Sequence, residues 1–121
     1  MTDKIFISVI IPVYNAEKYI GKCLNSVLSQ DFKKRIEIIM IDDASTDCSI
    51  KEIEKHNISF LKLYSESVNK GPSATRNIGI KNASGKYIFM MDVDDDSATN
   101  TLSTLYNVAE KDDCDLVFSD F

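Results

Sequence analysis

The sequence predicts an α/β domain with a mainly parallel central sheet and helices on both faces, and three observations favour this class. Short apolar runs rich in β-branched residues alternate along the chain with longer amphipathic runs. The first two apolar runs are nearly continuous, which is typical of strands buried on both faces. Polar residues gather directly after the apolar runs, at the edge where such sheets bind ligands.

Five segments have the composition of strands, and four have the periodicity or capping residues of helices. The strands are expected at 5–13, 36–41, 58–64, 86–92 and 115–121. The helices are expected at 16–30, 45–56, 73–83 and 99–111. A length of 121 residues suits one domain with a sizeable core.

Composition excludes several classes of function. The net charge of −5 argues against a protein that binds nucleic acid or an anionic membrane through a basic face. Cys23, Cys48 and Cys114 lack the spacing of a metal site, so we expect free thiols of a reducing compartment. His56 is expected on the surface at the end of a helix, which leaves no histidine for a Ser-His-Asp site.

The segment "YIFMMDVDDDSAT" (87–99) carries apolar residues directly into a run of aspartates. Asp92 and Asp94 are two apart at a strand end, so both can project to one side and bind a hard cation such as Mg²⁺ or Mn²⁺. The alternative is an acidic turn with ordinary surface charges. A calcium EF-hand is excluded, because Ser97 and Ser103 stand where that loop needs Gly and Glu. A phosphate-receiver domain and an aspartate-nucleophile phosphatase both need their acids earlier in the fold.

Other polar residues follow the first three strands. Asp42 and Asp43 can help to cap the next helix, or one of them can accept a hydrogen bond from a nucleobase. Tyr14 can lie against a base or have a structural role, and Arg76 can pair with a phosphate or with the acids. The glycines form no phosphate-binding loop, so a diphosphate ligand would need a metal ion to neutralise it.

Three segments taken together resemble the family 2 glycosyltransferases, which have the Rossmann-like GT-A fold. These are "SVIIPVYNAEKYIGKCLNSVLSQ", "IEIIMIDDASTD" and "NKGPSATRNIGIKNASGKYIFMMDVDDD". They resemble the opening strand and helix, the D-D-G/A-S-T-D strand end, and the N-x-G-x-x-x-A-R-N-x-G and D-x-D-D motifs. The resemblance covers residues 6–120 in the expected order.

For the nucleoside, the resemblance implies binding residues on the first two loops. Pro12 and Tyr14 would line the nucleobase pocket, and Asn15 stands at a matching position in the same motif. Asp43 would bond the base, usually uracil, and Asp42 would support it.

For the diphosphate, the resemblance implies that Arg76 and Asn77 lie near the donor. Asp92 and Asp94 form the D-x-D motif, with Asp92 toward the ribose and both residues at the Mn²⁺ or Mg²⁺ ion. The family usually has an aromatic residue after D-x-D-D, whereas this sequence has Asp96.

The resemblance implies an inverting, metal-dependent transfer of a sugar from a nucleotide-diphosphate donor, typically a UDP-sugar, to a saccharide or lipid-linked acceptor in polysaccharide biosynthesis. Family members are longer, so we expect 1–121 to be a truncated, N-terminal donor-binding domain. The catalytic base would lie beyond Phe121, and the acceptor-binding part would be missing. The truncated face would favour self-association.

We expect a cytoplasmic protein, with the full-length parent peripheral at the inner membrane face. Two alternatives remain. One is a non-catalytic module that binds a nucleotide sugar or serves assembly. The other is a sugar nucleotidyltransferase, which would carry a Gly-rich basic loop where this sequence has "PVYNAEKYIG".

Overall fold

A computed structural model describes residues 4–113 and contains one parallel sheet with the strand order β3-β2-β1-β4. In chain order the elements are β1 (Ile7–Val13), α1 (Ile20–Leu28), β2 (Ile36–Asp43), α2 (Ser49–Lys55), β3 (Leu61–Glu66), α3 (Pro72–Asn82), β4 (Tyr87–Met90) and α4 (Thr101–Asp112). The predicted α/β class is confirmed. The strand expected at 115–121 lies outside the described residues.

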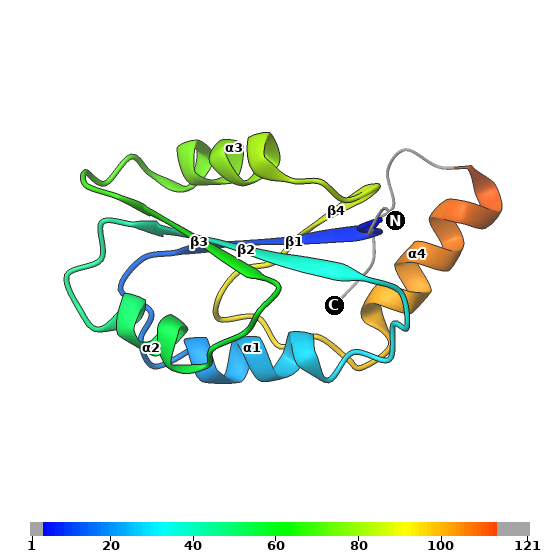
Figure 1. The fold of residues 1–121 in the computed structure, drawn as a ribbon, viewed down its shortest axis with the longest axis horizontal. Coiled ribbons are helices and arrows are strands. Elements are labelled where there is room, and N and C mark those ends of the chain that lie inside the picture. Colours follow the sequence, from blue (N-terminus) through cyan, green and yellow to red (C-terminus); the bar gives the residue numbers. More distant parts are fainter. Residues whose placement is uncertain (1–3, 114–121) are drawn as a thin grey trace.

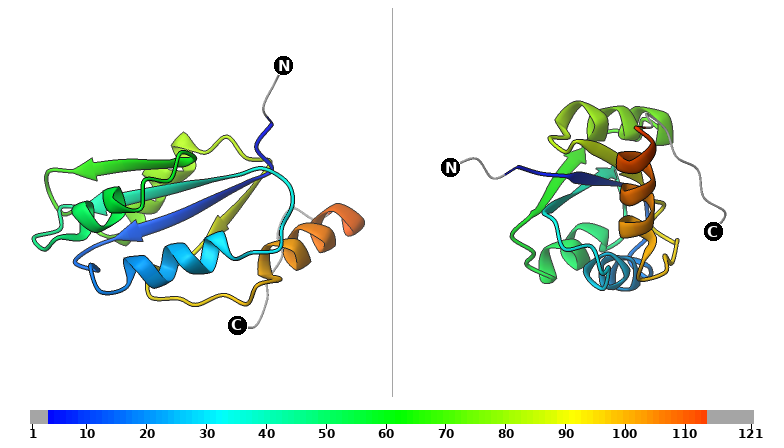
Figure 2. Two further views of the ribbon diagram at one scale, coloured as in Figure 1. Left: turned by 60° about the horizontal axis from the view of Figure 1, so that its bottom comes forward. Right: turned by 90° about the vertical axis from the view of Figure 1, so that its right-hand side faces the viewer.

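The helices form layers on both faces of the sheet (Figure 1). Helices α1 and α2 lie along one face, and α3 lies along the other. Helix α4 extends past the end of the sheet where the strands begin, as the two views in Figure 2 show. The strand order reverses between β1, which pairs with β2, and β4, which pairs with the opposite side of β1. Ligands of parallel α/β sheets bind beyond the carboxyl ends of the strands at such a reversal.

The main core lies between the sheet and α1, α2 and α4. It forms because alternate residues of each strand face the same side. Its fully buried side chains include Val9, Ile11, Ile20, Leu24, Ile38 and Met40. Burial of one such side chain stabilises the fold by about 1.5–3 kcal/mol.

A smaller core lies between the sheet and α3. Ile10, Ile39 and Ile41 are fully buried there and contact Ile78. Gly79 lets the helix approach this closely, because a Cβ at that position would lie 2.4 Å from Cγ2 of Ile10. The tight contact fixes the position of α3, which carries part of the carboxyl-end surface described below.

A buried carboxylate holds the start of the strands together. Glu37 is 3% exposed and accepts hydrogen bonds from Ser8 Oγ (2.6 Å) and the Ser84 backbone N–H (2.7 Å), and it pairs with Lys62 Nζ (3.1 Å). Burial alone would raise the pKa of Glu37, but these donors outweigh it and hold the pKa below its ordinary value. The Gly85 N–H also donates to Ser8 Oγ (2.8 Å). This network joins β1, β2, β3 and the segment before β4.

Three helices begin later than predicted: α4 begins at Thr101 instead of residue 99, and α1 and α2 differ more. Helix α1 was expected from residue 16 and begins at Ile20; in the segment before it, the N–H groups of Ala16 and Glu17 donate to Ser49 Oγ and an Asp47 carboxylate oxygen. Helix α2 was expected from residue 45 and begins at Ser49. Contacts between the two loops therefore replace the first turn of each predicted helix.

Three strands also end at other residues than predicted, and the first of them is β3, which was expected to end at residue 64 and runs to Glu66. Strand β2 was expected to end at residue 41, yet Asp42 and Asp43 continue its pairing with β3. Strand β4 was expected to run to residue 92 and ends at Met90, so the aspartates that follow belong to a turn. His56 follows α2 as expected and is half-buried, with its Nε2 atom buried and without a hydrogen-bond partner among the described residues.

Candidate nucleotide-binding cleft

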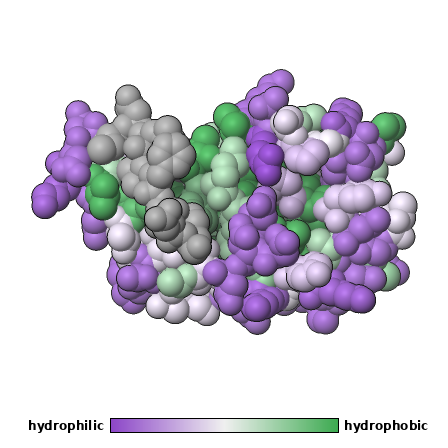
Figure 3. All heavy atoms as spheres, turned by 180° about the vertical axis from the view of Figure 1, so that it is seen from behind, coloured by the Kyte–Doolittle hydropathy of each residue, from purple (hydrophilic) through white to green (hydrophobic). Residues whose placement is uncertain are grey.

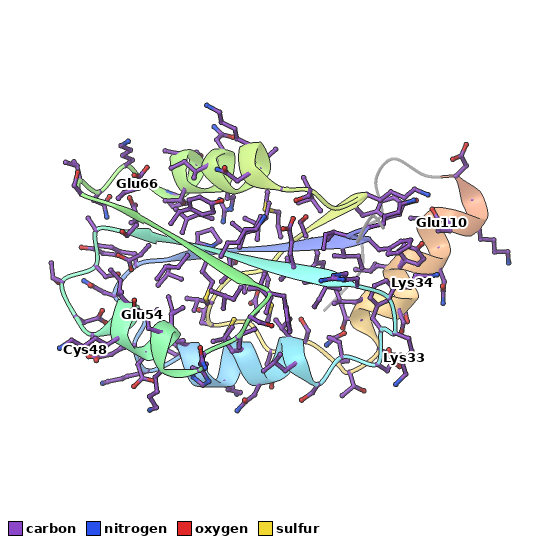
Figure 4. The ribbon with its side chains drawn as sticks, in the orientation of Figure 1. Lys33, Lys34, Cys48, Glu54, Glu66 and Glu110 are labelled. Atoms are coloured by element: carbon purple, nitrogen blue, oxygen red, sulfur yellow. The ribbon has the colours of Figure 1, made fainter. Side chains whose placement is uncertain are left out.

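An open cleft of about 560 Å³ lies at the carboxyl ends of the strands. Figure 4 marks this end of the molecule with Glu66 and Cys48, whereas Lys34 and Glu110 lie toward the opposite end. The cleft is lined from the loops after β1, β3 and β4, from the end of β2 and from the start of α3. Its lining includes Pro12, Tyr14, Asn15, Tyr19, Asp43, Asn69, Gly71, Thr75, Arg76, Asp92 and Asp94. A volume of this size is within the range of small-molecule sites.

The first wall of the cleft comes from the loop after β1. Tyr14 is 51% exposed, so its ring is available to a planar ligand. Asn15 has a φ of 45°, a conformation that asparagine adopts more readily than most residues. Its side-chain oxygen accepts a hydrogen bond from the Thr46 N–H (2.7 Å), and its N–H donates to Ser45 Oγ (2.9 Å). Asn15 therefore joins the loops after β1 and β2.

The two aspartates that end β2 hold different loops. Asp42 is buried and accepts hydrogen bonds from Ser45 Oγ (2.6 Å) and the Ser45 N–H (3.0 Å). Asp43 is also buried and accepts from the N–H groups of Lys70 (2.7 Å) and Gly71 (2.9 Å). Asp43 lines the cleft and Asp42 does not.

The opposite wall is an acidic turn, which we define as residues 92–96. The Asp95 N–H donates to the Asp92 carbonyl (3.0 Å), and the Asp92 N–H donates to the Asp95 carboxylate (3.2 Å). Asp92, Asp94 and Asp95 are exposed, and one carboxylate oxygen from each lies within 4.8 Å of the others. Asp96 pairs instead with Lys22 of α1 (3.7 Å).

The donor set of the acidic turn fits a hard divalent cation. Three carboxylates offer the oxygen ligands that Mg²⁺ and Mn²⁺ prefer, and their exposure leaves room for further oxygen ligands. Asp92 and Asp94 are the predicted pair, and the structure adds Asp95. The pKa of the nearby Cys23 thiol is raised to about 12. Burial is the largest cause, and the negative charges of Asp95 and Asp94 add to it.

A cation lies beside this anionic wall. Arg76 of α3 places Nη2 3.3 Å from Asp92 Oδ1, and both side chains are partly exposed. Such an exposed pair contributes little to stability, roughly 0–1 kcal/mol, so its guanidinium remains available to an anion in the cleft. Asn77, the next residue of α3, is exposed and is not among the residues that line the cleft.

The structure thus brings Pro12, Tyr14, Asn15, Asp43, Arg76, Asp92 and Asp94 to one cleft. Sequence reasoning missed the other lining residues, among them the polar or glycine positions Tyr19, Asn69, Gly71 and Thr75. Of these four, Asn69, Gly71 and Thr75 lie in the segment "NKGPSATRN", which follows a predicted strand and was the available indication.

None of the helices in residues 4–113 has the length and apolar character needed to cross a membrane.

Comparison with known proteins identifies relatives of this chain. The family described as Glycosyl transferase family 2 matches residues 8–121. Glycosyltransferase GlyA of Streptococcus pneumoniae is 45% identical over 105 residues, which cover 83% of this chain and 14% of GlyA. GlyA and seven further relatives are longer proteins, and the chain spans between 14% and 41% of their length.

Solved structures agree in fold. The crystal structure of Staphylococcus aureus TarS 1-349 in complex with UDP-GlcNAc superposes with a TM-score of 0.82 and 36% identity, over 88% of this chain and 32% of that one. The mannosyltransferase PcManGT from Pyrobaculum calidifontis, in complex with GDP-Man and Mn²⁺, gives 0.80 and 26% over the same shares. With the family match over residues 8–121, these results show that the chain belongs to glycosyl transferase family 2.

Proposed function

We propose that this chain is the donor-binding domain of a glycosyltransferase and binds a nucleotide-diphosphate sugar, with a UDP-sugar as the expected donor. The observation that carries the proposal is the convergence of an exposed tyrosine, a buried aspartate, an arginine and an acidic turn on one cleft. The complexes of TarS with UDP-GlcNAc and of PcManGT with GDP-Man and Mn²⁺ support it.

The nucleoside would occupy the part of the cleft between the loop after β1 and the end of β2. Tyr14 would lie against the base, with Pro12 beside it and Asn15 fixing the loop. Both oxygens of the Asp43 carboxylate accept backbone hydrogen bonds from the loop before α3, and a carboxylate keeps further lone pairs for a base N–H. Asp42 would support this position through Ser45.

The diphosphate would lie between α3 and the acidic turn. Arg76 would donate to phosphate oxygens, and Asn77 is proposed near the same part of the donor. Asp92 would accept from the ribose, and Asp92, Asp94 and Asp95 would hold Mn²⁺ or Mg²⁺. A cation bound there would neutralise the diphosphate and stabilise the charge that builds on it as the leaving group.

The rest of the reaction belongs to the proposal as well. The full-length parent would invert the anomeric centre and act on a saccharide or lipid-linked acceptor, using a catalytic base beyond Phe121. It would work in the cytoplasm or at the inner face of the membrane.

An apolar surface lies at the edge of the sheet that β4 forms. Ile88 and Met90 of β4 and Ile80 of α3 are exposed, and Figure 3 shows apolar surface on this side. That surface supports self-association of the chain, which sedimentation velocity measures.

Calorimetric titration of the chain with UDP in the presence of Mn²⁺ tests the proposal. We expect saturable binding that Asp94→Asn weakens by at least about tenfold, because a charged ligand to the cation is lost. Asp96→Asn is the matched control: it removes the same charge outside the cluster and is expected to leave the affinity within about twofold. Absence of heat with a folded chain contradicts the proposal.

The second candidate, a non-catalytic module, makes a different prediction for the parent protein. Asp94→Ala should abolish sugar transfer if the domain supplies the donor for catalysis. If the module interpretation holds, the same substitution leaves the assembly function of the parent intact.

A further inference from the structure

The acidic turn is fixed at both ends although it lies outside any helix or strand. On its amino side, the Met91 N–H donates to the Ile10 carbonyl (3.0 Å), which continues the pairing of β4 with β1. On its carboxyl side, residues 97–102 are hydrogen-bonded to α1 and to the residues that directly follow this helix. The two anchors enclose the short stretch that carries the cleft carboxylates.

Gln30 makes the most connections on the carboxyl side. Its Nε2 donates to the Ala98 carbonyl (2.8 Å), and its Oε1 accepts from the Leu102 N–H (3.0 Å). Leu102 lies in the first turn of α4, whose preceding residue Asn100 makes no capping hydrogen bond with its side chain. Gln30 therefore caps α4 from a distant part of the chain and at the same time holds the segment before it.

Ser26 provides the second connection, directly after the acidic turn. Its hydroxyl accepts from the Ser97 N–H (3.1 Å) and donates to the Ser97 carbonyl (3.2 Å). The side chain is 9% exposed, so water competes little for these bonds. Two hydrogen bonds from one Ser26 hydroxyl thus fix the backbone of Ser97, the residue that follows Asp96.

We propose that Ser26 and Gln30 are positioning residues that hold the acidic turn in the geometry needed to bind the cation and the diphosphate. The inference rests on the proposed function. Three carboxylates within 4.8 Å of one another repel, and without a cation an unanchored turn would spread. Anchors at both ends limit this spreading, so less ordering remains to be done when the ligand binds.

Two variants separate positioning from folding. Gln30→Glu keeps an acceptor for the Leu102 N–H, and its charge is favourable near the start of α4. It loses the N–H groups that donate to the Ala98 carbonyl and, within the same segment, to the Ser26 carbonyl. Ser26→Ala loses both bonds to Ser97 with little change in volume. Asn25→Ala is the matched control, because Asn25 is an exposed neighbour on the same helix.

Binding of Mn²⁺ to the chain, with and without UDP, is measured by electron paramagnetic resonance. We expect Gln30→Glu and Ser26→Ala to weaken Mn²⁺ binding by about fivefold to tenfold, the effect of losing one or two hydrogen bonds. Asn25→Ala should stay within about twofold, and the urea midpoint of Gln30→Glu should stay near that of the unchanged chain. The affinity for UDP in EDTA should fall by less than the affinity for Mn²⁺, because Tyr14 and Asp43 are untouched and the acidic turn would meet metal-free UDP only through Asp92 at the ribose. Amide hydrogen exchange at Ser97 should become faster in Ser26→Ala.

The outcomes distinguish this inference from the function on which it rests. If the unchanged chain binds Mn²⁺ and UDP but both variants bind Mn²⁺ equally well, positioning by α1 is refuted and the proposed function stands. An equal loss of UDP affinity in EDTA also refutes it, because the substitutions would then act on the whole fold. If the unchanged chain binds neither ligand, the proposed function and this inference fail together.

Discussion

Replacing glycine by alanine should change the free energy of unfolding in opposite directions at two helix positions. Gly79→Ala in α3 should lower it, and Gly21→Ala in α1 should raise it. Alanine at position 79 would place its Cβ 2.4 Å from Ile10 Cγ2 and 3.1 Å from Ile41 Cδ1. Both isoleucines are fully buried, so neither can move without disturbing the small core. At Gly21 the nearest atom is His56 Nε2 at 3.9 Å, an ordinary van der Waals contact.

The expected magnitudes follow from two opposing effects. Overpacking a buried contact costs about 1–3 kcal/mol, and replacing glycine by alanine within a helix returns up to about 1 kcal/mol. We therefore expect Gly79→Ala to lower the free energy of unfolding by about 1–2 kcal/mol, and Gly21→Ala to raise it by up to about 1 kcal/mol. In urea denaturation this separates the two midpoints by about 1 M or more.

A double substitution tests whether the cost arises at Ile10. Ile10→Ala alone should cost about 2–5 kcal/mol, because it leaves a cavity under α3. Combined with Gly79→Ala, it should cost less than the sum of the single variants, since the new methyl group enters space that Ile10 has left. If Gly79→Ala is as stable as the unchanged chain, or if the two effects simply add, the close packing of α3 is not what makes glycine necessary.

Two further predictions concern ionisable groups. Ser8→Ala removes the bonds from Ser8 to Glu37 and from Gly85, and should lower the free energy of unfolding by about 1–3 kcal/mol. Because the pKa of folded Glu37 lies below its ordinary value of 4.5, the part that comes from the bond to Glu37 is fully present above pH 4.5 and is lost as the pH falls through the folded pKa. The part from the Gly85 bond does not depend on this titration. Urea titrations at several pH values should show the two proteins converge in acid, and a constant difference would contradict this account. In a Cys114→Ser background at pH 8, Cys48 should react quickly with a thiol reagent, whereas Cys23, with a pKa near 12 and fully buried, should react only after unfolding. Equal rates for the two thiols would contradict it.

The layered fold was predictable because its causes are local. The apolar runs of β1 and β2 and the helical stripe of α1 each identify an element without reference to the rest of the chain. Element ends were less predictable, because tertiary hydrogen bonds decide them. Asp42 accepts its hydrogen bonds from the β2–α2 loop, and Asp43 accepts from the segment before α3. No local sequence pattern indicates these partners.

The position of the cleft was predictable because it follows from the order of the elements, which local sequence patterns indicate. The rule that ligands bind beyond the carboxyl ends of parallel strands needs only the order of elements. The reasoning about Asp92 and Asp94 was wrong in its detail, because it assumed that β4 continues to residue 92, whereas the two carboxylates meet through a turn that also recruits Asp95. Tyr19 lines the cleft as the residue directly before α1, whereas the sequence placed it within a helix that starts at residue 16.

Strand β2 sets the length of α3. Asp43, at one end of the strand, binds the Gly71 N–H just before the helix, and Glu37, near the other end, binds the Ser84 N–H just after it. Six residues of strand span about 20 Å, and an eleven-residue helix spans about 17 Å. The two carboxylates therefore hold both ends of α3 at a spacing that β2 determines. A residue inserted into or deleted from α3 would move one helix end by about 1.5 Å and rotate it by about 100°, so one of the two attachments would have to break.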